Sequence, residues 1–382
     1  MDGIPPSFRS LSSFRRPLTG LVLTVCFLLL LQAFVLEPFQ VPTGSMAPTL
    51  LGHHRSAVCP RCGYLVDVGR THADHDGSGG ERCYSQASCP NCGSRELPLG
   101  RSLETRGDHL LVNKSLYAMR APRRWEIVVF RMFGKVFIKR LIGLGGEEVE
   151  LVDGDIYVDG KLARKTFDEF LGMRVLVFDN DFAPEPDGWK DRWEFQPEKL
   201  DSLSSKEPLT LDGRAHRQQL TYRHFSLDEG KCLPIADEYG YNGDKTTPAE
   251  PVHDFMLDAE MDVVEGRGSV VFSLTDGEVE AEAEIAIGET RDAFVRTSPG
   301  ESAVGPKMQL EAGKRYHIEM ALVDRRLTMR VDGRDAFAPL DFPEARNRAP
   351  VVQPLHFTAH GVLIRLHKVR LYRDLHYTQL GK

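Results

Sequence analysis

A serine and a lysine in this chain have the types and surroundings needed for joint chemistry. Ser45 lies in the string Pro42-Thr-Gly-Ser-Met-Ala-Pro-Thr-Leu50, directly after the only long apolar segment, and Lys139 lies in the apolar run Phe137-Ile-Lys-Arg-Leu-Ile-Gly143. A serine hydroxyl is a weak nucleophile at neutral pH and needs a base to take its proton. A lysine serves as that base only when uncharged, and burial lowers its pKa. Strand alternation puts Lys139 on one face with apolar neighbours, which is consistent with an apolar pocket around it.

The apolar segment before Ser45 has the length of a membrane span. Residues 17–36 carry no charge, and a helix of about 20 residues crosses the roughly 30 Å bilayer core. Three arginines precede it and Glu37 follows it, so we expect the N-terminus in the cytoplasm and the rest outside. A cleaved secretory signal is the alternative, but the run is too long and no small-x-small site follows. We therefore expect a cytoplasmic tail (1–16), a single transmembrane helix (17–37) and a location in the inner (cytoplasmic) membrane.

Four cysteines form two near-identical knuckles, Cys59-Pro-Arg-Cys62-Gly and Cys89-Pro-Asn-Cys92-Gly. Paired C-x-x-C thiolates are typical of a zinc ribbon, in which four sulfurs close a tetrahedral, structural and non-catalytic site. Disulfides are the alternative in an oxidising compartment, and Cys83 could then pair with one of the four. His72 and His75 lie between the knuckles and are expected to be solvated loop residues. The predicted ligands of a structural Zn²⁺ are Cys59, Cys62, Cys89 and Cys92.

Composition and alternation predict a mainly β protein of two or three domains. The chain has 382 residues with 41% hydrophobic and 27% charged content, and its 34 glycines and 23 prolines favour many turns. The net charge of −7 argues against a general nucleic-acid binder. Alternating runs predict strands in 109–114, 126–130, 135–143 and 147–161, with a hairpin turn at Asp153-Gly154. From residue 253 strands and turns recur about every 8–12 positions, as in an antiparallel β-sandwich.

The predicted order of parts follows from these patterns. We expect a β-rich catalytic domain (38–165) that carries the cysteine insertion (59–93), an irregular linker or insertion with some helix (166–250), and a C-terminal sandwich (251–382). Its motif VDRRLTMRVDG resembles the strand-turn-strand of concanavalin/laminin-G-like sandwiches. We expect this sandwich to act as a binding module or as a spacer, with no catalytic chemistry of its own. Its first and last strands should pair, because an inserted domain needs its ends close together.

The strings around Ser45 and Lys139 resemble two conserved boxes of the bacterial type I signal peptidase (leader peptidase) family. The family's serine box reads approximately P-S-G-S-M-x-P-T-L, and Thr43 alone departs from it. Its lysine box reads approximately Y-I-K-R-x-I-G-x-P-G-D, against Phe137-Ile-Lys-Arg-Leu-Ile-Gly-Leu-Gly-Gly-Glu147 here. A string between them, Gly107-Asp-His-Leu-Leu-Val-Asn-Lys114, is similar to the family's G-D-x-x-x-V-N-K. Together the matches cover about a fifth of the chain.

The resemblance implies a membrane-bound serine endopeptidase that removes signal peptides during protein secretion. Ser45 would be the nucleophile and Lys139 the general base. Thr43 would supply an oxyanion hydroxyl beside the Ser45 backbone N–H. Val41, Pro42 and Met46 would contact the substrate, whose −1 and −3 residues would be small. No catalytic cofactor is expected, and the expected partners are exported preproteins and the lipid bilayer, with no nucleic acid.

The family also has a C-terminal box, approximately G-D-N-x-x-x-S-x-D-S-R, of which only a Gly-Asp in Tyr241-Asn-Gly-Asp-Lys245 is found here. This departure supports a second hypothesis, a catalytically lapsed relative that acts as a membrane-anchored binding protein. A third hypothesis, a self-cleaving repressor-type Ser-Lys protease, conflicts with the membrane anchor because such proteins are soluble.

Overall fold

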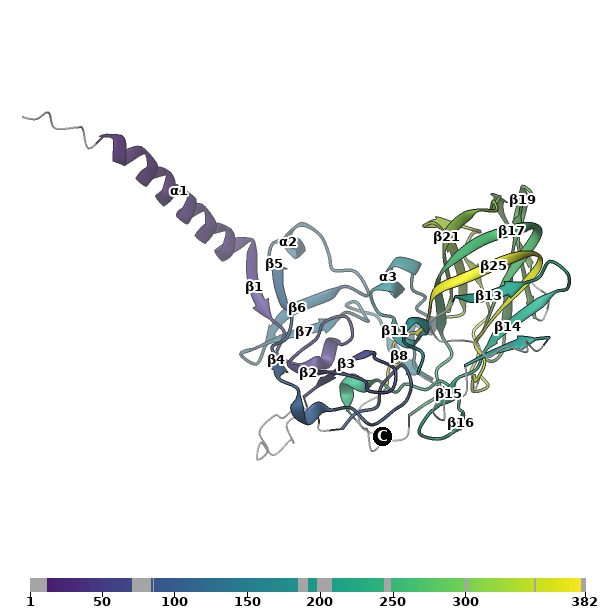
Figure 1. Ribbon diagram of the computed structural model, residues 1–382. Coiled ribbons are helices and arrows are strands. Elements are labelled where there is room, and N and C mark those ends of the chain that lie inside the picture. The colour runs from purple at the N-terminus through teal and green to yellow at the C-terminus, as the bar shows by residue number, and fades with distance from the viewer. Residues whose placement is uncertain are drawn as a thin grey trace, which may run out of the picture.

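The computed structural model describes residues 12–70, 84, 86–184, 192–197, 208–243, 249–298, 300, 302–346 and 348–378. Cys83, His72 and His75 lie outside them. Helix α1 (Ser12–Phe34) projects from the body of the molecule (Figure 1). Its stretch Pro17–Phe34 has a mean hydropathy of 2.1 and is long and apolar enough to cross a membrane. The helix ends before residue 37, because the chain pairs as a strand from Leu36 onward.

The part of the chain nearest α1 is built from four small antiparallel sheets and short helices. The mainly β class is confirmed, and the strands expected between 109 and 162 are present. The pairs are β1–β5 and β6–β7, and the triplets are β3-β2-β4 and β10-β9-β8. Their bounds are β1 Leu36–Gln40, β2 His54–Val58, β3 Leu65–Gly69, β4 Glu104–Thr105, β5 His109–Asn113, β6 Ile127–Met132, β7 Lys135–Arg140, β8 Val149–Val152, β9 Asp155–Val158 and β10 Lys161–Leu162. The short helices here are η1 Gly44–Met46, η2 Leu99–Arg101, α2 Leu116–Met119 and α3 Phe167–Leu171.

The turn between β8 and β9 has the geometry that its sequence predicts. Asp153 and Gly154 both have positive φ, 49° and 87°. Two successive positive φ values match the twist of a two-residue antiparallel hairpin, and Asp-Gly is a preferred pair there. The hairpin therefore fixes the register of β8 against β9, in which Val152 faces Asp155.

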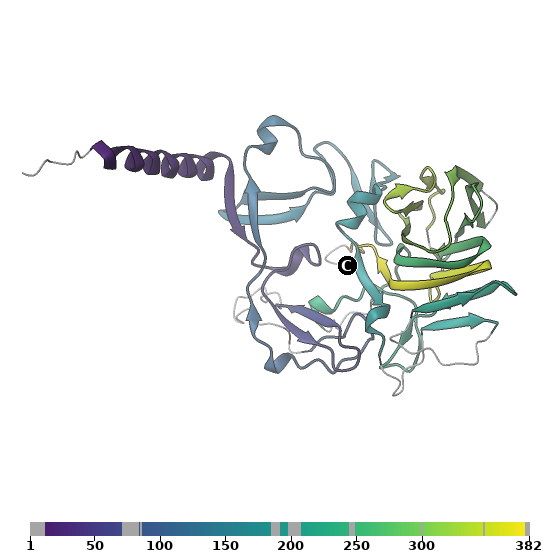
Figure 2. The same ribbon diagram turned by 45° about the horizontal axis from the view of Figure 1, so that its top comes forward.

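The large antiparallel sheet at the end opposite α1 forms the sandwich (Figures 1 and 2). Strands β17 and β25 run its length together, and β17 also pairs with β21 along 255–263 and with β18 along 268–275. Phe255 faces Arg373, so the predicted pairing of its first and last strands is confirmed. The apolar core of the sheet includes Phe272 and Phe357, both fully buried. Its bounds are β11 Val175–Asp179, β12 Trp193–Gln196, β13 Leu209–Asp212, β14 Gln218–Tyr222, β17 Phe255–Thr275, β18 Glu280–Ile287, β19 Arg291–Ser298, β20 Ser302–Met308, β21 Lys314–Val323, β22 Arg326–Val331, β23 Arg334–Asp335, β24 Leu340–Asp341 and β25 Leu355–Arg373.

The described residues of segment 166–250 differ from the irregular linker that the sequence suggests. Strands β11, β13 and β14 all pair with β25, and β12 pairs with β14. The segment is therefore part of the sandwich sheet, because its alternating residues, such as buried Leu209 and Leu211, complete the same core. The segment also contains the hairpin of β15 (Phe225–Ser226) and β16 (Lys231–Cys232) and the short helices η3 (Asn180–Phe182) and η4 (Gly240–Asn242). The division of the chain into domains stays a prediction.

The segment after β25 returns to the hairpin of β8 and β9. The backbone N–H of Tyr377 donates to the carbonyl of Gly154 over 3.1 Å. Tyr377 and Leu375 also pack against a small core around Trp125, Ile156 and Met173. The chain thus connects the sandwich to the part nearest α1 both before and after the sandwich strands.

Candidate active site and four-cysteine cluster

The loop that carries Ser45 is fixed by burial and by backbone hydrogen bonds. It leaves β1 at Gln40 and forms the short helix η1, which holds Ser45. Val41 and Met46 point inward and pack with Ile138 of β7. The N–H of Val41 donates to the carbonyl of Asp108 over 2.9 Å. The buried side chains on both sides of the loop leave Ser45 exposed at its tip.

The structure brings Ser45 and Lys139 together. The Nζ of Lys139 lies 2.5 Å from the Oγ of Ser45, within hydrogen-bond distance. Lys139 reaches the serine from β7, whose pairing with β6 sets Lys139 opposite Val128. Partial desolvation lowers the pKa of Lys139 below its usual value. The arrangement has the distance and the direction of pKa change that a serine and an uncharged base require.

The surroundings of Lys139 differ from the expected apolar pocket. Ile138, its neighbour on the other face of β7, is the buried residue, and Lys139 itself is partly open to solvent. The reason is that the Ile138 face packs onto the serine loop, whereas the face with Lys139 borders the exposed side of that loop. Arg140, next in the strand, donates to the hydroxyl of Thr49 over 2.9 Å and to the carbonyl of Trp125 over 2.9 Å. Arg140 therefore ties the end of the serine loop to the strand that carries Lys139.

The other residues expected near the serine take different positions. Thr43 is exposed, with extended backbone (φ −128°, ψ 155°), and its hydroxyl does not cap η1. Pro42 is also exposed. Val41 and Met46 are 0% and 6% exposed, so any contact of theirs with a substrate would use backbone atoms. The substrate-binding role of these residues stays a prediction.

Tyr241 is a residue of this site that sequence reasoning missed. It lies in η4, is 2% exposed, and its hydroxyl accepts a hydrogen bond from the N–H of Gly52 over 2.9 Å. Its ring fills the space against Gly44 and Gly69, where an added Cβ would lie 2.0 and 2.3 Å from ring atoms. The only sequence signal was the string Tyr241-Asn-Gly-Asp, and nothing in that string indicates a contact with a loop about 190 positions earlier.

The four cysteine sulfurs converge as a metal site requires. Their Sγ atoms lie within 4.8 Å of one another, and the Cys59–Cys92 and Cys62–Cys89 separations are both 3.7 Å. Sulfurs placed tetrahedrally about 2.3 Å from zinc lie about 3.8 Å apart, whereas bonded sulfurs lie about 2 Å apart. All four are free cysteines. The cluster is compatible with a structural zinc ion.

The two knuckles repeat each other in backbone geometry. Gly63 and Gly93 have φ values of 77° and 78°, and each donates its N–H to the first cysteine of its own knuckle over 2.8 Å. The left-handed conformation explains why glycine follows each C-x-x-C pair. The second knuckle also contacts the sandwich, because the side chain of Asn91 donates to the carbonyl of Phe182 and accepts from the N–H of Asp179.

A cavity of about 350 Å³ lies apart from the serine, between the second knuckle, β11, the β15–β16 hairpin and η4. Tyr239 and Gly240, adjacent to Tyr241, form one wall, and buried Arg373 forms another. Ser45 and Lys139 are not among the residues that line it. The serine–lysine pair is therefore an open surface site in this conformation.

Comparison with known proteins finds relatives for part of this chain. Residues 101–188 match the family model described as signal peptidase, peptidase S26. A probable signal peptidase I-2 of Synechocystis is 41% identical over 68 residues, which are 16% of this chain and 31% of that protein. The signal peptidase I of Rickettsia massiliae is 29% identical over 148 residues, which are 38% of this chain and 43% of that protein. The chain thus spans less than half the length of these relatives.

Two of the solved structures similar to this chain are described as a carbohydrate binding module and a carbohydrate recognition domain. The carbohydrate binding module CBM66 from Bacillus subtilis is 9% identical, with a TM-score of 0.26 over 47% of this chain and 94% of that one. The carbohydrate recognition domain of Emp47p is 9% identical, with a TM-score of 0.31 over 49% of this chain and 90% of that one. Similarities this low carry no argument about what the sandwich binds.

Proposed function

Because this chain belongs to the type I signal peptidase family, we propose that it is a membrane-bound serine endopeptidase that removes signal peptides from exported proteins. Ser45 is the nucleophile and Lys139 is its general base in this proposal. The observation that carries it is the 2.5 Å separation of the Lys139 Nζ from the Ser45 Oγ. Two strings far apart in the chain meet at this one point, in the loop that follows β1, the strand after a helix that can span a membrane.

The proposed reaction begins with proton transfer from Ser45 to uncharged Lys139. The serine oxygen then attacks the scissile carbonyl and forms an acyl-enzyme, while the proton passes to the leaving amine. Water, deprotonated by the same lysine, releases the product. The lowered pKa of Lys139 supports this role, because a larger fraction of the lysine is uncharged at a given pH.

We propose that the Ser45 backbone N–H and the Thr43 hydroxyl bind the developing oxyanion. The exposed position of Thr43, two residues before the nucleophile, supports the idea. Loss of one oxyanion donor typically costs about 3 kcal/mol of transition-state stabilisation. The exposed edge of the loop around Pro42 would hold the substrate, with small residues at −1 and −3.

The remaining parts have supporting roles in this proposal. Helix α1 anchors the chain in the inner membrane, with its N-terminus in the cytoplasm and the site on the outer side. Zinc on the four cysteines stabilises the ribbon, which braces the junction with the sandwich through Asn91. The sandwich serves as a binding or spacing module without chemistry of its own.

Cleavage of a preprotein by the full-length protein in liposomes tests the proposal. Ser45→Ala and Lys139→Ala should each lose cleavage, whereas Lys135→Ala, at an exposed position of the same strand, should retain it. Wild-type rates in either dyad variant would refute the Ser-Lys assignment. An inactive wild-type protein that still binds the preprotein would favour the catalytically lapsed relative.

A further inference from the structure

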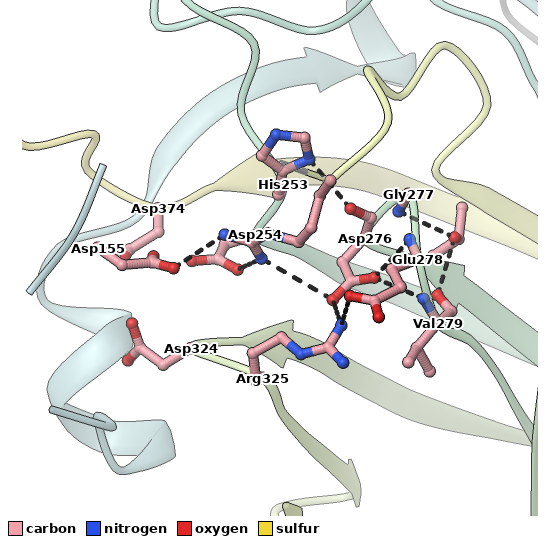
Figure 3. A network of polar contacts seen from close by, with 12 residues as sticks. Asp155, His253, Asp254, Asp276, Gly277, Glu278, Val279, Asp324, Arg325 and Asp374 are labelled. Carbon is pink, nitrogen blue, oxygen red and sulfur yellow. Dashed lines mark hydrogen bonds and ion pairs between the residues drawn. The ribbon is translucent and has the colours of Figure 1, made fainter. Parts of the chain in front are cut away.

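The junction between the β8–β10 sheet and the sandwich contains a buried cluster of charged side chains (Figure 3). Its carboxylates come from β9, from the start of β17, from two sandwich turns and from the segment after β25, and all are more than nine-tenths buried. They are Asp155, Asp254, Asp276, Asp324 and Asp374. The cations that the described residues place against them are Lys165, Arg325 and Arg348. Five buried carboxyl groups thus form ion pairs with three cations.

Each of these cations already forms ion pairs within the cluster. Lys165 lies 2.7 Å from both Asp324 and Asp374. Arg348 bridges Asp155 at 2.9 Å and Asp254 at 3.3 Å. Since a buried charge without compensation costs several kcal/mol, the two excess negative charges call for a further positive partner.

One carboxylate oxygen in this cluster has no partner. The Oδ1 of Asp374 is buried and makes no hydrogen bond among the residues that the structure describes. Asp374 is 5% exposed, and its other oxygen is taken by Lys165. Buried polar atoms are almost always satisfied, so an orphaned carboxylate oxygen indicates a missing ligand or water.

Carboxylate oxygens surround a space the size of one ion. Asp155, Asp254 and Asp324 each offer an oxygen, and these lie within 4.8 Å of one another. Oxygens bound to one Ca²⁺ at about 2.3–2.6 Å can be up to about 5 Å apart. A cavity of about 10 Å³ lies here, lined by Asp155, Asp254 and Asp374, and it has room for about one water-sized particle.

We propose that this junction is a binding site for one calcium ion. Asp155 and Asp254 are ligands, the unpaired oxygen of Asp374 is a third, and Asp324 completes the acidic wall. One divalent cation neutralises the two excess charges. Calcium accepts an irregular cage of protein oxygens, whereas Mg²⁺ needs near-octahedral geometry and keeps several waters. The ion would join β9 to the end of the sheet where β17 begins and β25 ends, and so fasten the sandwich to the part that carries Ser45. The site is independent of the proposed peptidase activity.

Terbium luminescence on the full-length protein in detergent tests the location. Tb³⁺ replaces Ca²⁺ at oxygen sites and emits when a nearby tryptophan is excited. The ring of Trp125 lies 4.8 Å from the Lys165 Nζ, which is itself 2.7 Å from Asp374, so Trp125 can sensitise an ion bound there. Excitation at 280 nm should give terbium emission that Ca²⁺ displaces. Trp125→Phe should lose that emission while calcium binding by calorimetry stays at one ion per chain.

Thermal unfolding tests the stabilising effect. The protein is freed of calcium on a chelating resin, with the zinc concentration held constant. Calcium at 100-fold excess over its dissociation constant should raise Tm by roughly 3–5 °C, and Mg²⁺ at the same ionic strength should raise it less. Asp155→Asn and Asp374→Asn should lose the rise, and the matched control Asp292→Asn, on exposed β19, should keep it.

Three results would overturn the proposal. The first is the absence of terbium emission from the wild-type protein. The second is a Tm that calcium leaves unchanged, and the third is terbium emission that persists in Trp125→Phe. The wild-type measurements decide the matter even where an aspartate variant fails to fold. If calcium leaves the wild-type Tm unchanged, protons bound to the carboxylates neutralise the excess charge instead.

Discussion

Replacing Gly44 by alanine should destabilise the serine loop by forcing it against Tyr241. The added Cβ would lie 2.0 Å from Cε1 and 2.8 Å from Cζ of that ring. The ring cannot simply move away, because Gly69 also packs closely against it and its hydroxyl accepts from Gly52. Overpacking of this kind costs about 1–3 kcal/mol, and loss of the hydrogen bond adds about 1 kcal/mol. For a chain of this size that corresponds to a fall in Tm of roughly 2–8 °C.

The assay is thermal unfolding of the full-length protein in detergent, together with its rate of preprotein cleavage. Gly100→Ala is the matched control, since a Cβ there meets nothing within 4 Å. Gly44→Ala should also slow cleavage, because Gly44 directly precedes Ser45. In a Tyr241→Ala background the ring is absent, and Gly44→Ala should then cost less than about 0.5 kcal/mol further. An equal cost in both backgrounds, or no cost in the wild type, would refute the contact.

Three further predictions concern the base, the topology and the metal. The pH profile of kcat/KM should rise with pH and have its inflection below 10.5, because desolvation lowers the pKa of Lys139 and only its uncharged form accepts the serine proton; an inflection at 10.5 or above would contradict this. A tag placed after Lys382 should be digested by protease added to intact spheroplasts, and protection until lysis would show the opposite orientation. Metal analysis should find about one zinc per chain, lost after Cys62→Ser together with Cys89→Ser, whereas a metal-free protein with two disulfides would exclude the zinc site.

Local patterns in the sequence predicted local structure well. The Asp153-Gly154 turn and the strands that flank it follow from alternation and from the need for positive φ. The two knuckles follow from the duplicated C-P-x-C-G string, since glycine at Gly63 and Gly93 permits the left-handed turn. Each of these features is decided by neighbours within a few residues.

Features that depend on distant parts of the chain could not be predicted from its pattern. Strand β13 pairs Leu209 with Leu366, and no short-range signal links residues so far apart. The contact between Ser45 and Lys139 was expected only from family resemblance, because their spacing in the sequence does not show that the serine loop and strand β7 lie together. The exposure of Lys139 depends on which face of β7 packs on the serine loop, and alternation does not decide between faces.

Mass spectrometry of a trapped acyl-enzyme tests the Ser-Lys assignment most directly. The full-length protein is mixed with excess of a peptide ester that has small residues at −1 and −3, and the reaction is quenched in acid within the burst phase. We predict an acyl adduct on the peptide that contains Ser45, present in wild type, absent in Ser45→Ala and greatly reduced in Lys139→Ala. An adduct on any other residue, or rapid cleavage with no adduct in Ser45→Ala, would contradict the assignment.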